Sequence, residues 1–349
     1  MSRRALRPAS LAICVALGAL GGCAPEREHR AQVYALSTLV EVSVMRRDVA
    51  TAHADVAAVE QELRRVERVF RAWDDGGLAE ANRALARDGH ASVAPELAAA
   101  LADAQALSAA SDGRFDPGVG RLVELWGFNT VERAAGPPPP AARLRDALST
   151  APRIARVAIG RTTLDAAPAA PWLDLGGYAK GLAVDRAIAT LRARGVRDAL
   201  VDAGGDLRAI GAHAGRPWRI GIRDPRAPRV LMRLEVAGDA CVFTSGDDER
   251  AFDWDGVHYH HIIDPATGAP ARGAASVTVL REQSACAPAD AAAITLMVAG
   301  PGSIDEVVQR FGLSGTVVIT EDGTVHASAA LARRLTPLVE GLHLVGASP

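Results

Sequence analysis

The residues with the clearest chemical potential lie in the segment LDLGGYAKG, where Asp174, two adjacent glycines and Lys180 follow one another. A tight turn that leads into a helix exposes backbone N–H groups at the positive end of the helix dipole, and such a site binds phosphate. Lys180 would add a cation at its rim, and Asp174 could accept a hydrogen bond from a ligand. A Gly-Gly turn is also ordinary turn chemistry, and the segment matches neither the GxGxxG fingerprint nor a P-loop.

A second glycine pair follows a predicted strand in VDAGGD, which ends at Asp206. Glycines let a ligand approach the backbone closely, although they also form ordinary hairpins. This motif is weak when it is taken alone.

Three histidines are grouped in the segment HYHHIIDPATG. In a strand, His258 and His260 would share one face while His261 points the other way. A metal held by His258 and His260 lacks an obvious third ligand, so the pattern favours solvent-exposed histidines. His261, at the strand end beside Asp264 and a Pro-Ala-Thr-Gly turn, is the better candidate for acid–base catalysis near neutral pH.

Asp290 lies in the first turn of a predicted apolar helix, where a carboxylate complements the helix dipole. As a ligand of a hard cation it would need oxygen partners from elsewhere, such as a carbonyl of the Gly176-Gly177 turn and the phosphates of a bound ligand. Farther upstream, SDGRFDP precedes Trp126 and Phe128, and the scarcity of aromatic residues assigns this pair to the core.

The elements that must position these residues follow from periodicity. Alternation predicts a strand over 38–44, with Leu39, Glu41 and Ser43 on one face and three valines on the other. Further strands are predicted at ALVDAG and WRIGI, and a hairpin through 254–256. Apolar spacing and stop signals predict helices over 49–73, 94–110 and 179–194, and the proline-rich stretch 134–142 is predicted as a surface linker. These alternations indicate a mixed body of helices and strands with no visible internal repeat.

The composition is that of a soluble globular protein of 349 residues, with 49% hydrophobic and 23% charged side chains. The 39 basic and 41 acidic side chains nearly balance, so no strong field indicates a nucleic acid partner.

The first residues are typical of an export signal. Three arginines precede an apolar run over 11–20, which is too short to span a bilayer comfortably, and Leu-Gly-Gly-Cys23 follows. This ending resembles the lipobox of bacterial lipoproteins, in which the cysteine becomes the acylated N-terminus. We therefore expect a signal peptide over 1–22, a membrane anchor at Cys23 and a tether over 23–33; the alternative is an ordinary secreted protein.

Two cysteines remain in the body of the protein, Cys241 and Cys286. They could pair in an oxidising compartment, but the sequence does not show whether their Cβ atoms meet. The pattern favours two small buried residues, and no ligand spacing for structural zinc is present.

Seven motifs, taken in chain order, are similar to those of the ApbE family of FAD:protein FMN transferases, which are commonly bacterial lipoproteins. They are SDGRFDPGVGRLVELWGF, LDLGGYAKGLAVD, VDAGGDLRAIG, PWRIGIRDP, TSGDDER, HHIIDPATGAP and ADAAAITLMVAG. The resemblance implies an α+β fold over 34–340, with mixed sheets, packed helices and two closely associated subdomains. It also implies a location on the outer side of the bacterial cytoplasmic membrane.

The resemblance further implies a reaction and a set of site residues. The FMN half of FAD would pass to a threonine or serine hydroxyl of an acceptor protein, a redox or electron-transport partner, and AMP would leave. His261 matches the family's histidine in the HIIDP motif, and we expect it to be the proton acceptor. A Mg²⁺ near Gly177 and Asp290 would bridge the pyrophosphate, and the residues that would line the FAD site are Arg114, Phe115, Asp116, Asp174 and Lys180.

Several positions depart from the family pattern. The family helix usually reads Asp-x-x-x-Thr, but Ile294 stands at the threonine position and Thr295 follows one residue later, well off the Asp290 face. Leu36-Ser37-Thr38 replaces Met-Gly-Thr, Arg71-Ala72-Trp73 replaces a Ser-x-Tyr segment, and Gly118 stands where a threonine often follows Asp-Pro. Two rival functions therefore remain open: a lipoprotein that binds FAD without transfer, and a pyrophosphatase that releases FMN and AMP.

Overall fold

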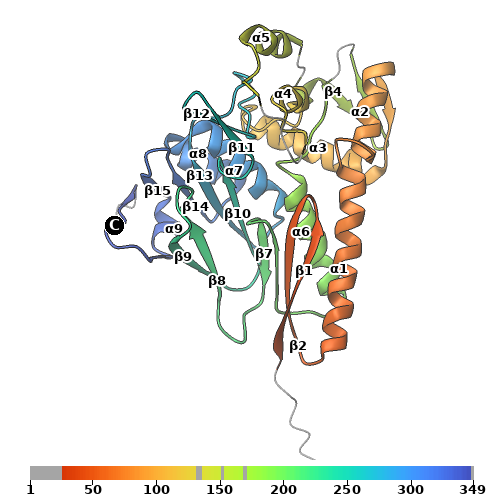
Figure 1. Ribbon diagram of the computed structural model, residues 1–349. Coiled ribbons are helices and arrows are strands. Elements are labelled where there is room, and N and C mark those ends of the chain that lie inside the picture. The colour runs from red at the N-terminus through yellow and green to blue at the C-terminus, as the bar shows by residue number, and fades with distance from the viewer. Residues whose placement is uncertain (1–25, 131–135, 151–152, 168–170, 347–349) are drawn as a thin grey trace, which may run out of the picture.

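The computed structural model describes residues 26–130, 136–150, 153–167 and 171–346 (Figure 1). The predicted signal peptide and Cys23 lie outside the described residues. From Arg27 on, the tether expected over 23–33 is wrong, because strand β1 begins there and pairs along its whole length with β2. Within the described part of the chain, no helix is both long and apolar enough to span a bilayer.

A nine-stranded sheet forms the centre of the molecule. All neighbouring strands are antiparallel except the last pair, β15 and β17. In spatial order the strands are β1 (Arg27–Ala35), β2 (Thr38–Arg46), β6 (Ala199–Ala203), β7 (Leu207–Ile210), β10 (Ala240–Gly246), β13 (Ser276–Glu282), β14 (Gly315–Ile319), β15 (Val325–Ala327) and β17 (Leu344–Val345).

Helices cover one face of this sheet and bury its larger core (Figure 1). They are α1 (Val49–Phe70), α6 (Ala179–Ala193), α7 (Ala287–Ala299) and α8 (Ile304–Phe311). The predicted alternation of β2 is confirmed, because Val40, Val42 and Val44 are fully buried in this core while Leu39 on the other face is 58% exposed. The helices predicted to begin at residues 49, 94 and 179 are confirmed, although α1 ends at Phe70, before the predicted limit of 73.

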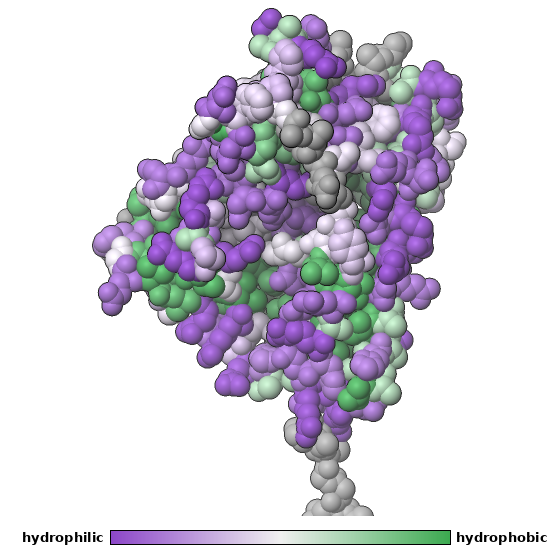
Figure 2. All heavy atoms as spheres, in the orientation of Figure 1, coloured by the Kyte–Doolittle hydropathy of each residue, from purple (hydrophilic) through white to green (hydrophobic). Residues whose placement is uncertain are grey.

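The other face of the sheet is covered over only part of its width. A small sheet of β8 (Trp218–Arg223), β9 (Val230–Val236) and β16 (Leu335–Pro337) packs on it together with α9 (Ala329–Ala332). Trp218, Ile222 and Met232 meet side chains of β7, β10 and β14 in a second core. The face over β1 and β2 remains open. Hydrophilic side chains cover most of the side of the molecule shown in Figure 2.

The remaining elements gather at one end of the molecule (Figure 1). They are α2 (Gly77–Asp88), α3 (Pro95–Ala110), α4 (Gly120–Leu125), α5 (Ala141–Thr150), β3 (His90–Ser92), β4 (Val157–Ile159), β5 (Thr163–Ala166), β11 (Ala251–Trp254) and β12 (Val257–His260). Trp126 and Phe128 are buried in a third cluster, as predicted for a core pair. The predicted linker ends earlier than expected, because α5 begins at Ala141 directly after the four prolines, which are tolerated before a helix start. The predicted α+β class is confirmed.

Candidate functional site

The LDLGGYAKG segment forms a turn that leads into α6, as predicted. The Asp174 carboxylate accepts a hydrogen bond from the backbone N–H of Gly176 at 2.8 Å, which closes the turn. Helix α6 then begins at Ala179, so Lys180 lies in its first turn. Along the chain, Asp174 therefore comes before the tight turn and Lys180 comes after it.

Glycines in this segment allow the start of α6 to approach α7. A Cβ on Gly177 would lie 2.0 Å from Cδ1 of Ile294 and 3.4 Å from the Phe115 ring. A Cβ on Gly181 would lie 2.5 Å from the Cα of Ala287 at the start of α7. Side chains at these positions would force the helices apart, so the glycines bring Lys180 close to the first turn of α7, which carries Asp290.

Lys180 is the cation of a buried cluster of acidic side chains. It forms an ion pair with Asp206, which is 2% exposed and stands after the second glycine pair. The Asp206 carboxylate also accepts a hydrogen bond from the N–H of Thr244 at 3.1 Å. The charges of Glu249, at the rim, and of Asp290 act on Lys180 as well. The weak VDAGGD motif thus supplies one of the central residues of the site.

The cluster holds an excess of negative charge, with three carboxylates around one ammonium group. Burial by itself lowers the pKa of Lys180, but the charges of Asp206, Glu249 and Asp290 outweigh it and hold this pKa above its ordinary value. Burial and the charge of Asp206 raise the pKa of Asp290 to about 8, and one hydrogen bond, from the N–H of Gly181 at 3.2 Å, partly opposes this shift. The site therefore favours a further positive charge beside Asp290.

His261 lies beside this cluster with a free ring nitrogen. Its Nδ1 atom is buried and has no hydrogen-bond partner among the described residues. Burial, followed by the charges of Arg250 and Lys180, holds the pKa of His261 well below its ordinary value. The ring is therefore neutral at pH 7, which is the state in which it accepts a proton. The neighbouring Asp264 is engaged elsewhere, because its carboxylate closes the following turn through Ala266 and Thr267.

The other two histidines of the segment have structural roles. The rings of His258 and His260 stack with their centroids 6.4 Å apart, so the predicted shared face is confirmed. The expectation that both are solvent-exposed is wrong for His260, which is 2% exposed and contacts the carbonyl of Ala271 at 2.8 Å through Nε2. His258 contacts the carboxylate of Asp253 at 2.8 Å and the carbonyl of Asp247 at 3.0 Å. All of these ring atoms already hold the β11–β12 hairpin in place.

The GRFDP segment borders the turn from another side. Phe115 is buried against Gly177, and Arg114 is half-buried with its guanidinium 3.5 Å from Asp112. Asp116 is buried and accepts hydrogen bonds from the N–H groups of Gly118, at 2.8 Å, and Ile154, at 3.0 Å. One oxygen of Asp116 therefore joins two loops, while its Oδ2 atom is buried without a hydrogen-bond partner among the described residues.

Two tryptophans lie beside Asp174, and of these only Trp73 was singled out from the sequence, within a segment that departs from the family pattern. Nε1 of Trp73 donates a hydrogen bond to the Asp174 carboxylate at 3.1 Å, and the Trp73 ring stacks on Trp172 with centroids 5.3 Å apart. Trp73, which belongs to the segment that departs from the family pattern, thus contacts a predicted site residue directly. The signal for Trp73 was its departure from the family's Ser-x-Tyr segment, whereas no sequence pattern singled out Trp172.

A family model named ApbE matches residues 36–317 of the chain. The chain belongs to the ApbE family. Curated ApbE relatives named FAD:protein FMN transferase include one from Rhodobacter capsulatus, which is 38% identical over 347 residues, and one from Treponema pallidum, which is 35% identical over 349 residues. These alignments cover 97% and 93% of this chain, but the chain spans only 65% of the Rhodobacter protein, against 94% of the Treponema protein. The chain is therefore a member of a family of enzymes.

Solved ApbE structures share the fold. The ApbE protein of Thermotoga maritima is 31% identical, with a TM-score of 0.79 over 88% of this chain and 99% of that one. The flavin transferase ApbE of Vibrio cholerae is 27% identical, with a TM-score of 0.76 over 89% of this chain and 100% of that one. The expected ApbE fold is confirmed.

The residues predicted to hold a metal fit a hard cation in part. Asp290 offers a buried carboxylate in a cluster with excess negative charge, and Gly177, which packs against Ile294 of the same helix, has a backbone carbonyl of the kind that hard cations bind. Ile294 offers no oxygen and covers Gly177 with a methyl group. Thr295 does not replace the absent hydroxyl, because its Oγ1 atom donates to the carbonyl of Ala291 at 2.8 Å inside the helix. The prediction that Thr295 lies off the Asp290 face of the helix is thus confirmed.

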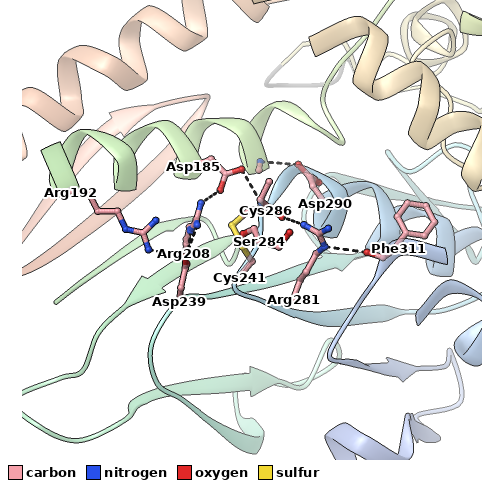
Figure 3. Close-up of a disulfide and its surroundings, with 12 residues drawn as sticks. Asp185, Arg192, Arg208, Asp239, Cys241, Arg281, Ser284, Cys286, Asp290 and Phe311 are labelled. Carbon is pink, nitrogen blue, oxygen red and sulfur yellow. Dashed lines mark hydrogen bonds and ion pairs between the residues drawn. A yellow bond between two sulfur atoms is a disulfide. The ribbon is translucent and has the colours of Figure 1, made fainter. Parts of the chain in front are cut away.

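The start of α7, which carries Asp290, is fixed by a disulfide (Figure 3). Cys241 of β10 and Cys286, the N-cap of α7, are joined, so the interpretation as two unpaired buried cysteines is wrong. The Asp185 carboxylate of α6 accepts a hydrogen bond from the N–H of Cys286 at 2.8 Å and forms an ion pair with Arg208. The disulfide between Cys241 and Cys286 depends on a contact between β10 and the start of α7, which the sequence alone does not reveal.

Proposed function

We propose that the chain transfers the FMN half of FAD to a threonine or serine hydroxyl of an acceptor protein and releases AMP. The observation that carries this proposal is the position of neutral His261 beside the buried cluster of Lys180, Asp206 and Asp290. A site for phosphoryl transfer needs charge neutralisation and positioning, together with a base for the weak hydroxyl nucleophile. The names of the ApbE relatives support the same reaction.

The proposed step balances as follows. The acceptor hydroxyl oxygen forms a bond to the FMN phosphorus, and the bond from this phosphorus to the bridging oxygen breaks. AMP leaves with that oxygen, and the hydroxyl proton passes to the free Nδ1 atom of His261. Lys180 and the N–H groups at the start of α6 hold the pyrophosphate, while Asp174 and Phe115 border the flavin-bearing part of the site.

We propose that Asp290 and the carbonyl of Gly177 hold a Mg²⁺ ion at this site. When bound, Mg²⁺ neutralises the charge of the pyrophosphate. The excess of carboxylates around Lys180 supports a cation here, and Ile294 leaves one usual ligand position without an oxygen.

The test is an incubation of the soluble body of the protein with FAD, Mg²⁺ and short synthetic peptides that each hold one threonine. Covalent FMN on a peptide, detected by flavin fluorescence after denaturation, supports the transferase. Free FMN and AMP without labelled peptide indicate a pyrophosphatase, and intact bound FAD indicates a carrier. Failure to bind any flavin contradicts all three.

We further propose that Cys23 is acylated and anchors the protein to the outer side of the bacterial cytoplasmic membrane. The Leu-Gly-Gly-Cys ending supports the anchor, and the Cys241–Cys286 disulfide supports an exported protein because such bonds persist in oxidising compartments. A Cys23→Ser variant is expected to move from the membrane fraction to the soluble fraction. Equal membrane retention of both forms would contradict the anchor.

A further inference from the structure

A groove runs along β8 on the open face of the large sheet. It encloses a cavity of about 760 Å³. One wall is formed by β8 and its flanks, and the floor is the polar face of β2, β6 and β10. We name it the β8 groove; the lining residues that matter most below are Arg216, Arg223, Thr244, Gly246 and Glu249. The residues predicted for FAD and Mg²⁺ lie outside this lining, so the groove is a separate feature of the surface.

The wall of the groove is an edge strand with a free side. β8 lies at the end of its three-stranded sheet and pairs with β9 only; within the described ranges no strand pairs with its other edge. A free edge offers a row of backbone N–H and C=O groups that an extended peptide can pair with. The six residues of β8 give an edge of about 20 Å at about 3.3 Å per residue. Pro217 and Pro225 lie just outside the strand ends, which limits pairing to this stretch.

The groove leads to the candidate active site. Thr244, which lines it, donates its N–H to the Asp206 carboxylate that pairs with Lys180. Glu249, also in the lining, acts by its charge on Lys180. Two residues of the groove lining, Thr244 and Glu249, thus interact directly with the cluster, so the groove borders the candidate active site.

Two arginines of the groove are available for a partner. Among the described residues, Arg216 and Arg223 have no ion-pair partner, although both lie beside the free edge. In contrast, Arg219 of the same strand is paired with Glu235 at 3.2 Å. Guanidinium groups at the rim of an edge strand bind carbonyl or carboxylate oxygens of an incoming segment.

We propose that the acceptor protein presents its hydroxyl on an extended segment that pairs with the free edge of β8 and contacts Arg216 and Arg223. This inference rests on the proposed FMN transfer, because it identifies where the second substrate of that reaction docks. Backbone pairing holds the segment in register, and the hydroxyl enters the site past Gly246 and Glu249. The acceptor site must then be unfolded or lie in a loop, since a helical segment cannot pair with a strand edge.

The experiment uses the threonine peptides described above, first with wild-type protein. Each labelled peptide is resynthesised with single N-methyl groups along its backbone, which remove one N–H donor at a time. Strand pairing predicts that methylation blocks labelling at every second position near the threonine, because alternate N–H groups face β8. Hydrogen exchange with a threonine-to-alanine peptide is expected to show slowed amide exchange within residues 219–223.

A charge change on β8 gives a second measure. Arg223→Glu is expected to raise the apparent KM for the peptide by about tenfold while the Kd for FAD stays unchanged. Arg161→Glu, an exposed arginine in the turn between β4 and β5, is the matched control and is expected to leave both constants unchanged.

Two outcomes overturn the inference without touching FAD chemistry. One is labelling that tolerates every N-methyl group and leaves exchange of β8 unchanged. The other is an apparent KM for the peptide that stays unchanged in Arg223→Glu. Turnover of FAD with no labelled peptide contradicts the proposed transfer itself, and not the docking site alone. If FAD is neither bound nor cleaved, the proposed function itself fails, and the inference falls with it.

Discussion

Cδ1 of Ile294 lies over Gly177 so closely that a Cβ at residue 177 would be only 2.0 Å from it. The contact joins the glycine turn at the start of α6 to the face of α7 that carries Asp290. The ApbE pattern usually has a threonine at the Ile294 position, so an aliphatic group here stands where the resemblance implies a ligand of the proposed Mg²⁺.

Replacing Ile294 by threonine tests this contact. Ile294→Thr is expected to tighten Mg²⁺ binding by about tenfold, because a hydroxyl joins the Asp290 carboxylate, at a cost of about 1 kcal/mol in folding stability. Calorimetric titration of the flavin-free protein with Mg²⁺ measures the affinity. Ile294→Val is the matched control, since it removes the same Cδ1 atom without adding oxygen. Equal gains in Mg²⁺ affinity for both variants would show that the space taken by Cδ1 of Ile294, and not the lack of an oxygen ligand, limits Mg²⁺ binding.

The charge of Asp290 has an opposite effect on stability and on metal binding. Its pKa is raised to about 8, so between about pH 4 and pH 8 the folded protein keeps a proton that the unfolded chain has lost, and this group lowers stability as the pH rises through that range. Asp290→Asn is therefore expected to raise Tm at pH 7 without Mg²⁺ and to abolish both turnover and the increase of Tm on adding Mg²⁺. Asp305→Asn, an exposed carboxylate in the first turn of α8, is the control. A normal Mg²⁺ response in Asp290→Asn would place the cation elsewhere.

The role of His261 is tested by its pH dependence. His261→Gln is expected to lower the rate of FMN transfer by about 10²–10⁴-fold with an unchanged Kd for FAD, since a base is lost and no binding group. Because the pKa of His261 is held well below 6.5, the wild-type rate is expected to stay constant above pH 6.5 and to fall only in more acidic solution. His53→Gln, on the exposed face of α1, serves as the control. A wild-type rate that halves near pH 7 would contradict the neutral ring.

The disulfide is expected to stabilise the start of α7. Joining residues 45 positions apart restricts the unfolded chain, and the chain-entropy model gives about 4 kcal/mol for such a loop. Cys286→Ser is expected to lower the free energy of unfolding by an amount of this order in urea titrations. Wild-type protein treated with a reductant should show the same loss. An unchanged midpoint in both cases would mean that the hydrogen bond from Cys286 to Asp185 is sufficient to hold the helix start.

Periodicity predicted the elements well because it reports which side chains are buried. The valines of β2 and the apolar rows of α1 and α6 lie where alternation and helical spacing indicated. The tether prediction was wrong from Arg27 on, because β1 is a polar edge strand that pairs with β2 in a hairpin through Leu36 and Ser37, neither of which is a usual residue at the positive φ that this turn requires. The linker prediction was wrong at its end, because α5 begins at Ala141.

The candidate site was only partly readable from the sequence. Motifs of the ApbE type identified Lys180, Asp290 and His261, but the ion pair between Lys180 and Asp206 depends on two turns that are 26 positions apart. Glu249 gave no signal beyond the TSGDDER motif, although its charge acts on Lys180. The hydrogen bond from Trp73 to Asp174 likewise required the fold, because 101 residues separate the two.

The central claim is that cleavage of FAD and labelling of the acceptor are one event. The most direct test measures AMP and peptide-bound FMN together, during the first turnover of wild-type protein with FAD, Mg²⁺ and a threonine peptide that the protein labels. The proposed reaction predicts one AMP released for each FMN attached, with no free FMN. AMP released together with an equal amount of free FMN, whether or not peptide is present, would contradict the transfer and identify the protein as a pyrophosphatase.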